Sequence, residues 1–366
     1  MRKAVPTMKG AKLSMNQEMK VIDVDIHNSL KSHMDLIPYL PEPWKSRVAG
    51  SGLGLPGHGY QSPIGVIRND CRPPSGGPAA SDPEFLVKDL LEPFHIEYGI
   101  LTGNLMGVST MHDPDHAAAI SSAYNDHLVE NWLEKHTQFR GSILVSAYDP
   151  LLAAREIDRM ADHPRMVGVI MGSGQRALLG QRQFHPIYEA AERHGLSVAI
   201  HPGTEGAGGS NPPTASGYPT RYLEWHTSLS QNYMAHLTSL VCEGVFEKFP
   251  RLKFVLLEGG IAWLPHLMWR LDKNYKGLRS SVPWLKRMPS EYIRDHCLFS
   301  TQPIEEPEDP KHLISIFDMI DAENILMFSS DYPHWDNDVP TEILKRLSPE
   351  AKRKIYYENA KALYHL

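Results

Sequence analysis

The chain has 366 residues, of which 42% are hydrophobic and 22% are charged; this is the composition of an ordinary globular protein and excludes disordered, collagen-like and disulfide-stapled chains. Its 37 basic residues against 43 acidic ones give a formal net charge of -6. That balance offers no basic footprint for a nucleic acid or an anionic membrane, so we expect neither as a partner.

Residues 1–20 are predicted to be an N-terminal tail that precedes a single domain of residues 21–366. The tail is basic, but it lacks the apolar run of about 7 to 15 residues that a secretory signal needs. No later stretch approaches the roughly 20 apolar residues of a membrane helix. The cysteines, Cys71, Cys242 and Cys297, are too far apart for a thiolate zinc site or a disulfide framework. We therefore expect a cytoplasmic protein.

Short apolar runs alternate along the chain with longer segments of helical periodicity. Strands are predicted over residues 21–26, 98–101, 142–146, 166–171, 196–200, 253–257, 297–300 and 325–328. Helices are predicted over residues 116–135, 150–161, 185–194, 230–248, 261–271, 310–320 and 349–364. This alternation indicates βαβ units and a parallel sheet that is covered on both faces. Eight such units predict an α/β fold, a (β/α)8 TIM barrel; an open doubly wound sheet is the alternative.

Two long loop insertions are predicted, after strands 1 and 5. A bare barrel needs about 250 residues, so this chain has length to spare. The first insertion covers residues 28–97 and the second covers residues 202–225; both contain stretches rich in Pro, Gly and Ser. Both follow the C-terminal ends of strands, where barrel active sites are assembled.

Metal-competent side chains collect at these strand ends. The first strand runs through Asp23, Asp25 and His27, which the two-residue alternation of a strand places on one side. Three further candidates follow other strands: His201 after the fifth, Glu258 after the sixth and Asp331 after the eighth. In a barrel these positions share one face. Taken singly, each has an alternative role, because a strand-end Asp is often a helix N-cap and a lone His is often a satisfied polar group.

This set of residue types points to a divalent metal ion. Imidazole nitrogen and carboxylate oxygen suit borderline ions, so we expect zinc first, with manganese or iron, and one or two ions, as alternatives. Such an ion lowers the pKa of its bound water and polarises a carbonyl or carboxylate. A nearby base then completes the chemistry, and Asp331 or Glu258 is the candidate for that proton transfer.

The loops supply candidates for binding a small-molecule substrate. Arg68, Arg72 and Arg221 are predicted to clamp a carboxylate, because guanidinium matches carboxylate in a bidentate way; solvated loop charge is the alternative for each. His226 follows the second insertion and is a candidate catalytic residue that points into the barrel mouth. His334, close to Asp331, is a further substrate-binding candidate.

Four motifs carry a family resemblance: VIDVDIH at the first strand, VAIHPG at the fifth, FEKFPRLKFVLLEGGIAWLPHLMWRLD through the sixth and MFSSDYPHWD at the eighth. The chain resembles the metal-dependent amidohydrolase superfamily, in the amidohydrolase-related branch that includes aminocarboxymuconate semialdehyde decarboxylase and the resorcylate decarboxylases. The resemblance implies that Asp25, His27, His201 and Asp331 bind a metal. Glu258 stands where this branch has a His that acts as proton donor or base; a glutamate there could act as acid or base, or bind a second ion.

Three functions are compatible with these residues and with the resemblance. The first is a metal-dependent hydrolase or carboxy-lyase that acts on a small cyclic or carboxylated metabolite. The second is a dinuclear Mn or Fe monooxygenase of the same superfamily, for which Glu258 and His226 would supply extra ligands. The third is a weakly catalytic partner subunit with a structural metal. Since relatives are commonly oligomers, the resemblance also implies a homo-oligomer, and the third function would imply a hetero-oligomer.

Overall fold

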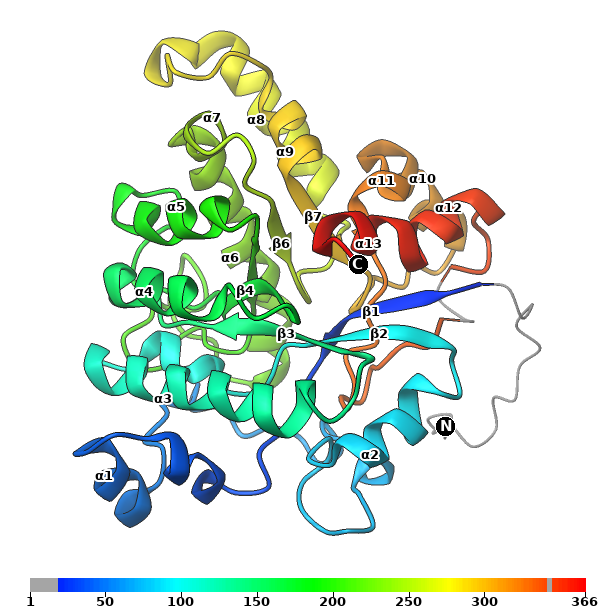
Figure 1. The fold of residues 1–366 in the computed structure, drawn as a ribbon. Coiled ribbons are helices and arrows are strands. Elements are labelled where there is room, and N and C mark those ends of the chain that lie inside the picture. Colours follow the sequence, from blue (N-terminus) through cyan, green and yellow to red (C-terminus); the bar gives the residue numbers. More distant parts are fainter. Residues whose placement is uncertain (1–18, 341–343) are drawn as a thin grey trace.

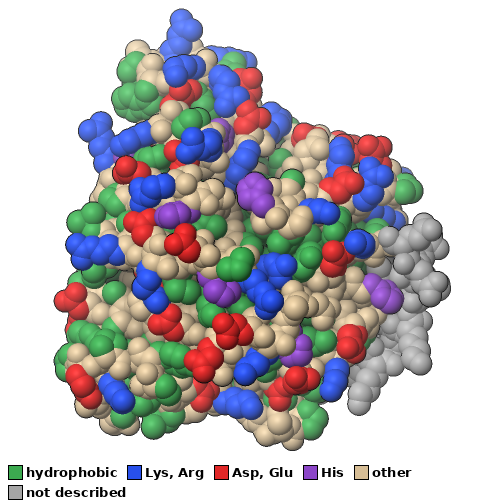
Figure 2. Space-filling view, in the orientation of Figure 1, with side chains coloured by type: hydrophobic (Ala, Val, Ile, Leu, Met, Phe, Trp, Pro, Cys, Tyr) green, Lys and Arg blue, Asp and Glu red, His purple; other side chains and the backbone are tan. Residues whose placement is uncertain are grey.

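The computed structural model describes residues 19–340 and 344–366. The predicted N-terminal tail therefore lies, up to residue 18, outside the described residues. In the described part of the chain, no helix combines the length and the apolar character needed to cross a bilayer. On the face seen in Figure 2, basic and acidic side chains are interspersed.

Eight parallel strands form the centre of the molecule (Figure 1). They are β1 (Val21–Ile26), β2 (Ile96–Leu101), β3 (Phe139–Leu144), β4 (Met166–Gly172), β5 (Ser197–His201), β6 (Phe254–Leu256), β7 (Cys297–Ser300) and β8 (Leu326–Met327). Each pairs with the next in chain order, from β1 to β8. Because every strand follows its sequence neighbour, the doubly wound alternative, which needs a reversal of strand order, is excluded.

The barrel closes between β1 and the segment that follows β8. The backbone N–H of Val24 donates to the carbonyl of Phe328 at 3.0 Å, and that of His27 donates to the carbonyl of Tyr332 at 2.9 Å. A parallel bridge joins Ile26 to Tyr332. The predicted (β/α)8 barrel is confirmed.

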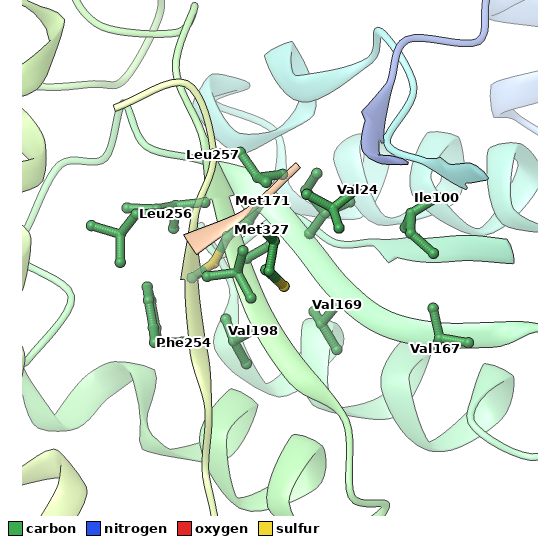
Figure 3. Close-up of a cluster of buried hydrophobic side chains, with 14 of the residues drawn as sticks. Val24, Ile100, Val167, Val169, Met171, Val198, Phe254, Leu256, Leu257 and Met327 are labelled. Carbon is green, nitrogen blue, oxygen red and sulfur yellow. The ribbon is translucent and has the colours of Figure 1, made fainter. Parts of the chain in front are cut away.

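Apolar side chains fill the space around the strands. Figure 3 shows Val24 of β1, Val169 of β4, Val198 of β5 and Met327 of β8 within one buried cluster. All four are fully buried. Strands covered on both faces have no solvent side, which explains why they read as continuous apolar runs in the sequence.

Helices surround the barrel in the predicted alternation (Figure 1). They are α3 (Pro114–Leu128), α4 (Pro150–Met160), α5 (His185–Arg193), α6 (Tyr222–Cys242), α7 (Val245–Lys248), α8 (Leu264–Leu278), α9 (Pro289–His296), α10 (Pro310–Ile320), α11 (Ala322–Ile325), α12 (Pro349–Arg353) and α13 (Asn359–Tyr364). The π-helical turns η6 (Val129–Leu133) and η9 (Lys354–Glu358) continue α3 and α12. The helix predicted over residues 349–364 is thus one continuous run of α and π turns.

The insertion after β1 contains short helices that the sequence pattern did not predict. They are η2 (His33–Tyr39), α1 (Trp44–Ser51), η3 (Asn69–Cys71), α2 (Pro83–Leu86) and η4 (Val87–Leu91). None exceeds eight residues, which is little more than two turns, and this is why the pattern indicated only a loop.

The insertion after β5 is shorter than predicted because α6 begins at Tyr222 rather than at residue 230. The Glu224 carboxylate accepts the backbone N–H groups of Thr220 and Arg221, both at 2.8 Å, and so caps the helix start. The other end also differs: Gly244, at φ 72°, separates α6 from α7 inside the single helix predicted over residues 230–248. This early start places Trp225 and His226 within the helix.

Candidate metal centre

Side chains from four strands meet at the C-terminal end of the barrel. Asp25 lies on β1 and His27 just after it, His201 ends β5, Glu258 follows β6 and Asp331 follows β8. Ligand-capable atoms within 4.8 Å of one another form two overlapping groups: Asp25, His27, His201 and Glu258 in the first, and His27, Glu258, Asp331 and His334 in the second. The structure therefore brings together all five residues that the strand ends indicated as metal ligands.

The spacing of the donor atoms suits a metal ion. His201 Nε2 lies 3.0 Å from Glu258 Oε1 and 3.5 Å from Asp25 Oδ2. His27 Nε2 lies 3.1 Å from Asp331 Oδ1, 3.2 Å from Glu258 Oε1 and 3.7 Å from Asp25 Oδ1. Metal–donor bonds of about 2.0–2.2 Å separate neighbouring donors by roughly 3–3.6 Å. Small shifts would let these atoms share one ion.

Hydrogen bonds orient both imidazoles for this purpose. His27 Nδ1 contacts the carbonyl of Gly103 at 2.9 Å, and His201 Nδ1 contacts the carbonyl of Pro202 at 2.8 Å. A carbonyl only accepts, so each Nδ1 carries the proton and each Nε2 presents its lone pair to the centre. A backbone carbonyl is a common outer partner of a metal-binding histidine.

Two buried atoms of the centre lack a hydrogen-bond partner. They are Asp25 Oδ2 and His201 Nε2, while Asp25 Oδ1 accepts the Thr102 hydroxyl at 2.6 Å. An unsatisfied buried polar atom is costly, and buried polar groups in proteins are nearly always paired. Both atoms belong to the first donor group, so the residues present fit a cation bound between them.

The electrostatics of the centre also favour positive charge. Burial lowers the pKa of His201, but the charges of Glu258 and Asp25 outweigh it and raise that pKa to about 10. Burial likewise opposes protonation of His27, whose pKa the surrounding carboxylates, Asp25 first, hold well above its ordinary value. The carboxylates therefore stabilise a cation at this position, whether proton or metal, and a metal would bind with release of protons.

Glu258 and Asp331 behave as a coupled pair. Burial and the charge of Glu258 raise the pKa of Asp331 well above its ordinary value. Burial opposes the charge on Glu258, but His201 and His27 outweigh it and hold its pKa well below the ordinary value. Two neighbouring buried carboxyl groups cannot both ionise freely, so the pair retains a proton. Both also lie on left-handed backbone, at φ 52° and 57°, a conformation uncommon outside glycine and frequent at functional sites.

A buried carboxylate behind the centre was missed by the sequence reasoning. Glu205 is fully buried, and it accepts the Ser173 hydroxyl and, at 2.8 Å, the backbone N–H of Gly203. That N–H belongs to the same peptide unit as the Pro202 carbonyl that accepts His201 Nδ1–H. Glu205 thus holds the peptide that orients His201. Its position four residues after His201 was the available signal, but the surrounding Gly-rich sequence indicated a loop.

The centre lies on the floor of a cavity of about 940 Å³. Among the predicted substrate-binding and catalytic residues, Arg72, His226 and His334 line this cavity together with Glu258 and Asp331. His226 extends from α6 and stacks on Tyr222, with ring centres 5.7 Å apart. His334 Nδ1 contacts Asp331 Oδ1 at 2.5 Å, so it also belongs to the donor cluster.

The predicted arginine clamp is not assembled. Arg68 is buried outside the cavity lining, and its guanidinium donates to Asp70 at 2.6 Å and to Asn337 at 2.5 Å. Arg221 is exposed at the start of α6 and also lies outside the lining. Of the three, only Arg72 lines this cavity. The sequence could not separate them because all three lie in loops whose paths are fixed by tertiary contacts.

Comparison with known proteins gives consistent matches over nearly the whole chain. The family model described as Amidohydrolase matches residues 22–366. The gamma-resorcylate decarboxylase of Polaromonas sp. (strain JS666) is 26% identical over 294 residues, covering 76% of this chain and 86% of that protein.

Solved structures share the fold. A 5-carboxyvanillate decarboxylase from Novosphingobium aromaticivorans, complexed with manganese and 4-hydroxy-3-methoxy-5-nitrobenzoic acid, superposes with a TM-score of 0.70 at 21% identity, covering 96% of this chain and 97% of that one. A dihydroxybenzoic acid decarboxylase from Polaromonas sp. JS666, with bound manganese and the inhibitor 2-nitroresorcinol, gives a TM-score of 0.65 at 21% identity, covering 95% and 97% of the two chains.

Proposed function

The chain belongs to the amidohydrolase family and is an enzyme, and from this premise we propose that it is a metal-dependent carboxy-lyase that removes CO2 from a hydroxylated aromatic acid. One observation carries the proposal: histidines and carboxylates from four strands converge, partly unsatisfied, on the floor of a cavity large enough for an organic substrate. The carboxy-lyase names of the relatives support decarboxylation over hydrolysis.

We assign Asp25, His27 and His201 of the first donor group, together with Asp331, whose Oδ1 lies 3.1 Å from His27 Nε2, as the residues that would hold a divalent ion. Mixed nitrogen and oxygen donors suit zinc and manganese alike, and the manganese in the related structures supports manganese as the first metal to test. When bound, such an ion supplies positive charge that holds the substrate carboxylate and an adjoining hydroxyl oxygen.

The proton comes from the Glu258–Asp331 pair in this mechanism. Both carboxyl groups line the cavity; Asp331, whose pKa is raised, holds the proton, and Glu258 would relay it to the ring carbon that bears the carboxylate. A carbon–hydrogen bond forms there, the bond from that carbon to the carboxylate breaks, and its electron pair restores the aromatic ring as CO2 leaves. Arg72 would pair with the anionic substrate, and His226 would donate a hydrogen bond from the cavity wall.

The direct test is CO2 release from 2,6-dihydroxybenzoate and 5-carboxyvanillate by protein loaded with Mn²⁺ or Zn²⁺. We expect turnover of at least one acid, and its loss in Glu258→Gln, which keeps the shape of the side chain but cannot supply the proton. Metal content measured on the same samples separates a failed mechanism from an unloaded protein. A fully loaded protein that releases no CO2 from either acid contradicts the proposal.

A second candidate, the dinuclear Mn or Fe monooxygenase, is favoured by one specific observation. His334 and Asp331 form a second donor group that shares His27 and Glu258 with the first, so the two groups together would supply ligands for two ions. Counting ions per chain distinguishes the two functions: one ion supports the carboxy-lyase, and two ions with O2-dependent product formation support the oxygenase.

A further inference from the structure

Large apolar side chains remain exposed on one side of the cavity mouth. Ile64 is fully exposed, Trp335 is 50% exposed and Ile67 is 40% exposed, yet all three line the cavity. We call these three residues the apolar lip. Exposed apolar groups that adjoin a cavity commonly mark a ligand-binding surface.

The lip is held in place by the strand-end segment that carries the donors. The backbone N–H of Trp335 donates to the Val66 carbonyl at 2.9 Å, and Ile67 pairs with His334 in an antiparallel bridge. The Arg68 guanidinium adds its bond to Asn337. The lip therefore stands at a fixed position relative to His334 and the metal centre.

The same insertion also contributes an aromatic wall. The His58 ring centre lies 4.3 Å from that of Trp225, and the Tyr60 and Tyr222 ring centres lie 5.7 Å and 5.4 Å from Trp225. His58, Tyr222 and Trp225 all line the cavity. Residues 55–67 thus connect an aromatic wall on α6 with the apolar lip beside the β8 end.

The polarity of the cavity lining changes from its floor to its mouth. Its volume of about 940 Å³ lies near the upper limit of ordinary ligand cavities, which run from about 300 to 1,000 Å³. The residues that would hold the ion lie at the floor, and Ile64, Ile67 and Trp335 make the mouth apolar on the lip side.

We propose that the substrate is an aromatic acid with an extended apolar substituent, which lies against Ile64, Ile67 and Trp335. The proposal rests on the proposed function for the acid at the floor, and it adds a subsite of defined chemistry at the mouth. An apolar substituent is the occupant that the geometry favours, because the lip is continuous with the cavity that holds the reacting group.

Binding of two unreactive analogues tests the subsite. Calorimetric titration of the Mn²⁺-loaded protein would compare 2-nitroresorcinol with its 5-pentyl derivative. We expect the pentyl compound to bind about tenfold more tightly or better, since even one methylene group in an apolar pocket changes discrimination by about 10-fold or more. In Ile64→Ser and Trp335→Ala the preference should fall several-fold, while the affinity for 2-nitroresorcinol should stay within about twofold.

Leu151→Ser is the matched control. Leu151 is 61% exposed on α4 and lies outside the cavity lining, so its loss removes a similar apolar side chain without touching the site. The control should keep the wild-type preference for the pentyl compound.

Three outcomes overturn the proposal. The first is equal affinity for both compounds in the wild-type protein, and the second is no binding of either compound. The third is a change of oligomeric state in Ile64→Ser with the ligand preference intact, which would assign the lip to a contact between copies of the chain. Sedimentation velocity on the same variants measures their oligomeric state and so detects the third outcome. If the pentyl preference holds but neither parent acid releases CO2, the subsite stands and the proposed reaction fails.

Discussion

The floor and the mouth of the cavity are built by different means. The floor consists of side chains at the ends of β1, β5, β6 and β8, whose positions the hydrogen bonds of the barrel fix. The mouth combines exposed side chains of the insertion, Ile64 and Ile67, with Trp335 of the segment after β8, and backbone contacts join the two segments. The sheet therefore positions the side chains that can do chemistry, whereas the insertion and the segment after β8 shape the access to them.

Removing a floor ligand should have the largest effect. His201→Ala deletes one donor of the first group and leaves Asp25 and Glu258 without their buried partner. Loss of an outer-shell partner lowers metal affinity by about 10- to 100-fold, so we expect more than 100-fold for a ligand. Competition with a metal chelator measures it. Unchanged metal affinity would show that the ion binds elsewhere and that the floor of the cavity is not the metal centre.

A buried histidine behind the floor should make stability depend on pH. His236 lies fully buried, with Nδ1 accepting the Leu179 N–H at 3.2 Å and Nε2 donating to the Ser173 carbonyl at 2.8 Å. Burial lowers its pKa from 6.5 to about 4. The unfolded chain therefore binds more protons between these values, and the folded state loses stability as pH falls from about 6.5 towards 4.

The size of that loss is of order 3 kcal/mol, at 1.36 kcal/mol per pKa unit. Urea unfolding of the wild-type protein and of His236→Gln at pH 7 and at pH 4.5 measures it as a difference between variants. We expect a smaller pH dependence in the glutamine variant. Equal pH dependence in both would assign the acid sensitivity to other groups.

Disturbing the support of His201 should weaken metal binding by less than removing the ligand. Glu205→Ala leaves the Gly203 N–H and the Ser173 hydroxyl without their acceptor, so the Pro202–Gly203 peptide loses its anchor. We expect metal affinity to fall by about 10- to 100-fold. Glu205→Gln retains an acceptor oxygen and should recover most of the affinity. Equal losses in both variants would point to the carboxylate charge instead of the hydrogen bond.

The smallest effect is expected at the mouth. Arg68→Ala removes the guanidinium that ties the insertion to Asn337, which lies beyond the donor residues. We expect KM to rise several-fold with kcat within about twofold, because the reacting groups at the floor keep their positions. A large fall in kcat with unchanged KM would mean that the insertion also positions the reacting groups at the floor, so the two regions would not act separately.

Much of the barrel could be predicted because its signal is local. Each strand is a short apolar run, and the polar residue that ends it is adjacent in sequence, so Asp25, His27, His201, Glu258 and Asp331 were identifiable before any contact was known. The start of α6 could not be predicted, because in the sequence Glu224 resembles an ordinary charged residue within a loop and its capping role is not visible.

The sequence by itself determined the order of strands and helices and the residue types at the floor, because hydrophobic periodicity and strand alternation depend only on near neighbours in the chain. The tertiary structure alone decided that Arg72 faces the cavity while Arg68 supports the insertion, that Glu205 orients His201, and that His334 joins the donors. The contact of Arg68 with Asn337, for example, joins residues 269 positions apart, and side-chain partners at that separation are set by how the barrel closes.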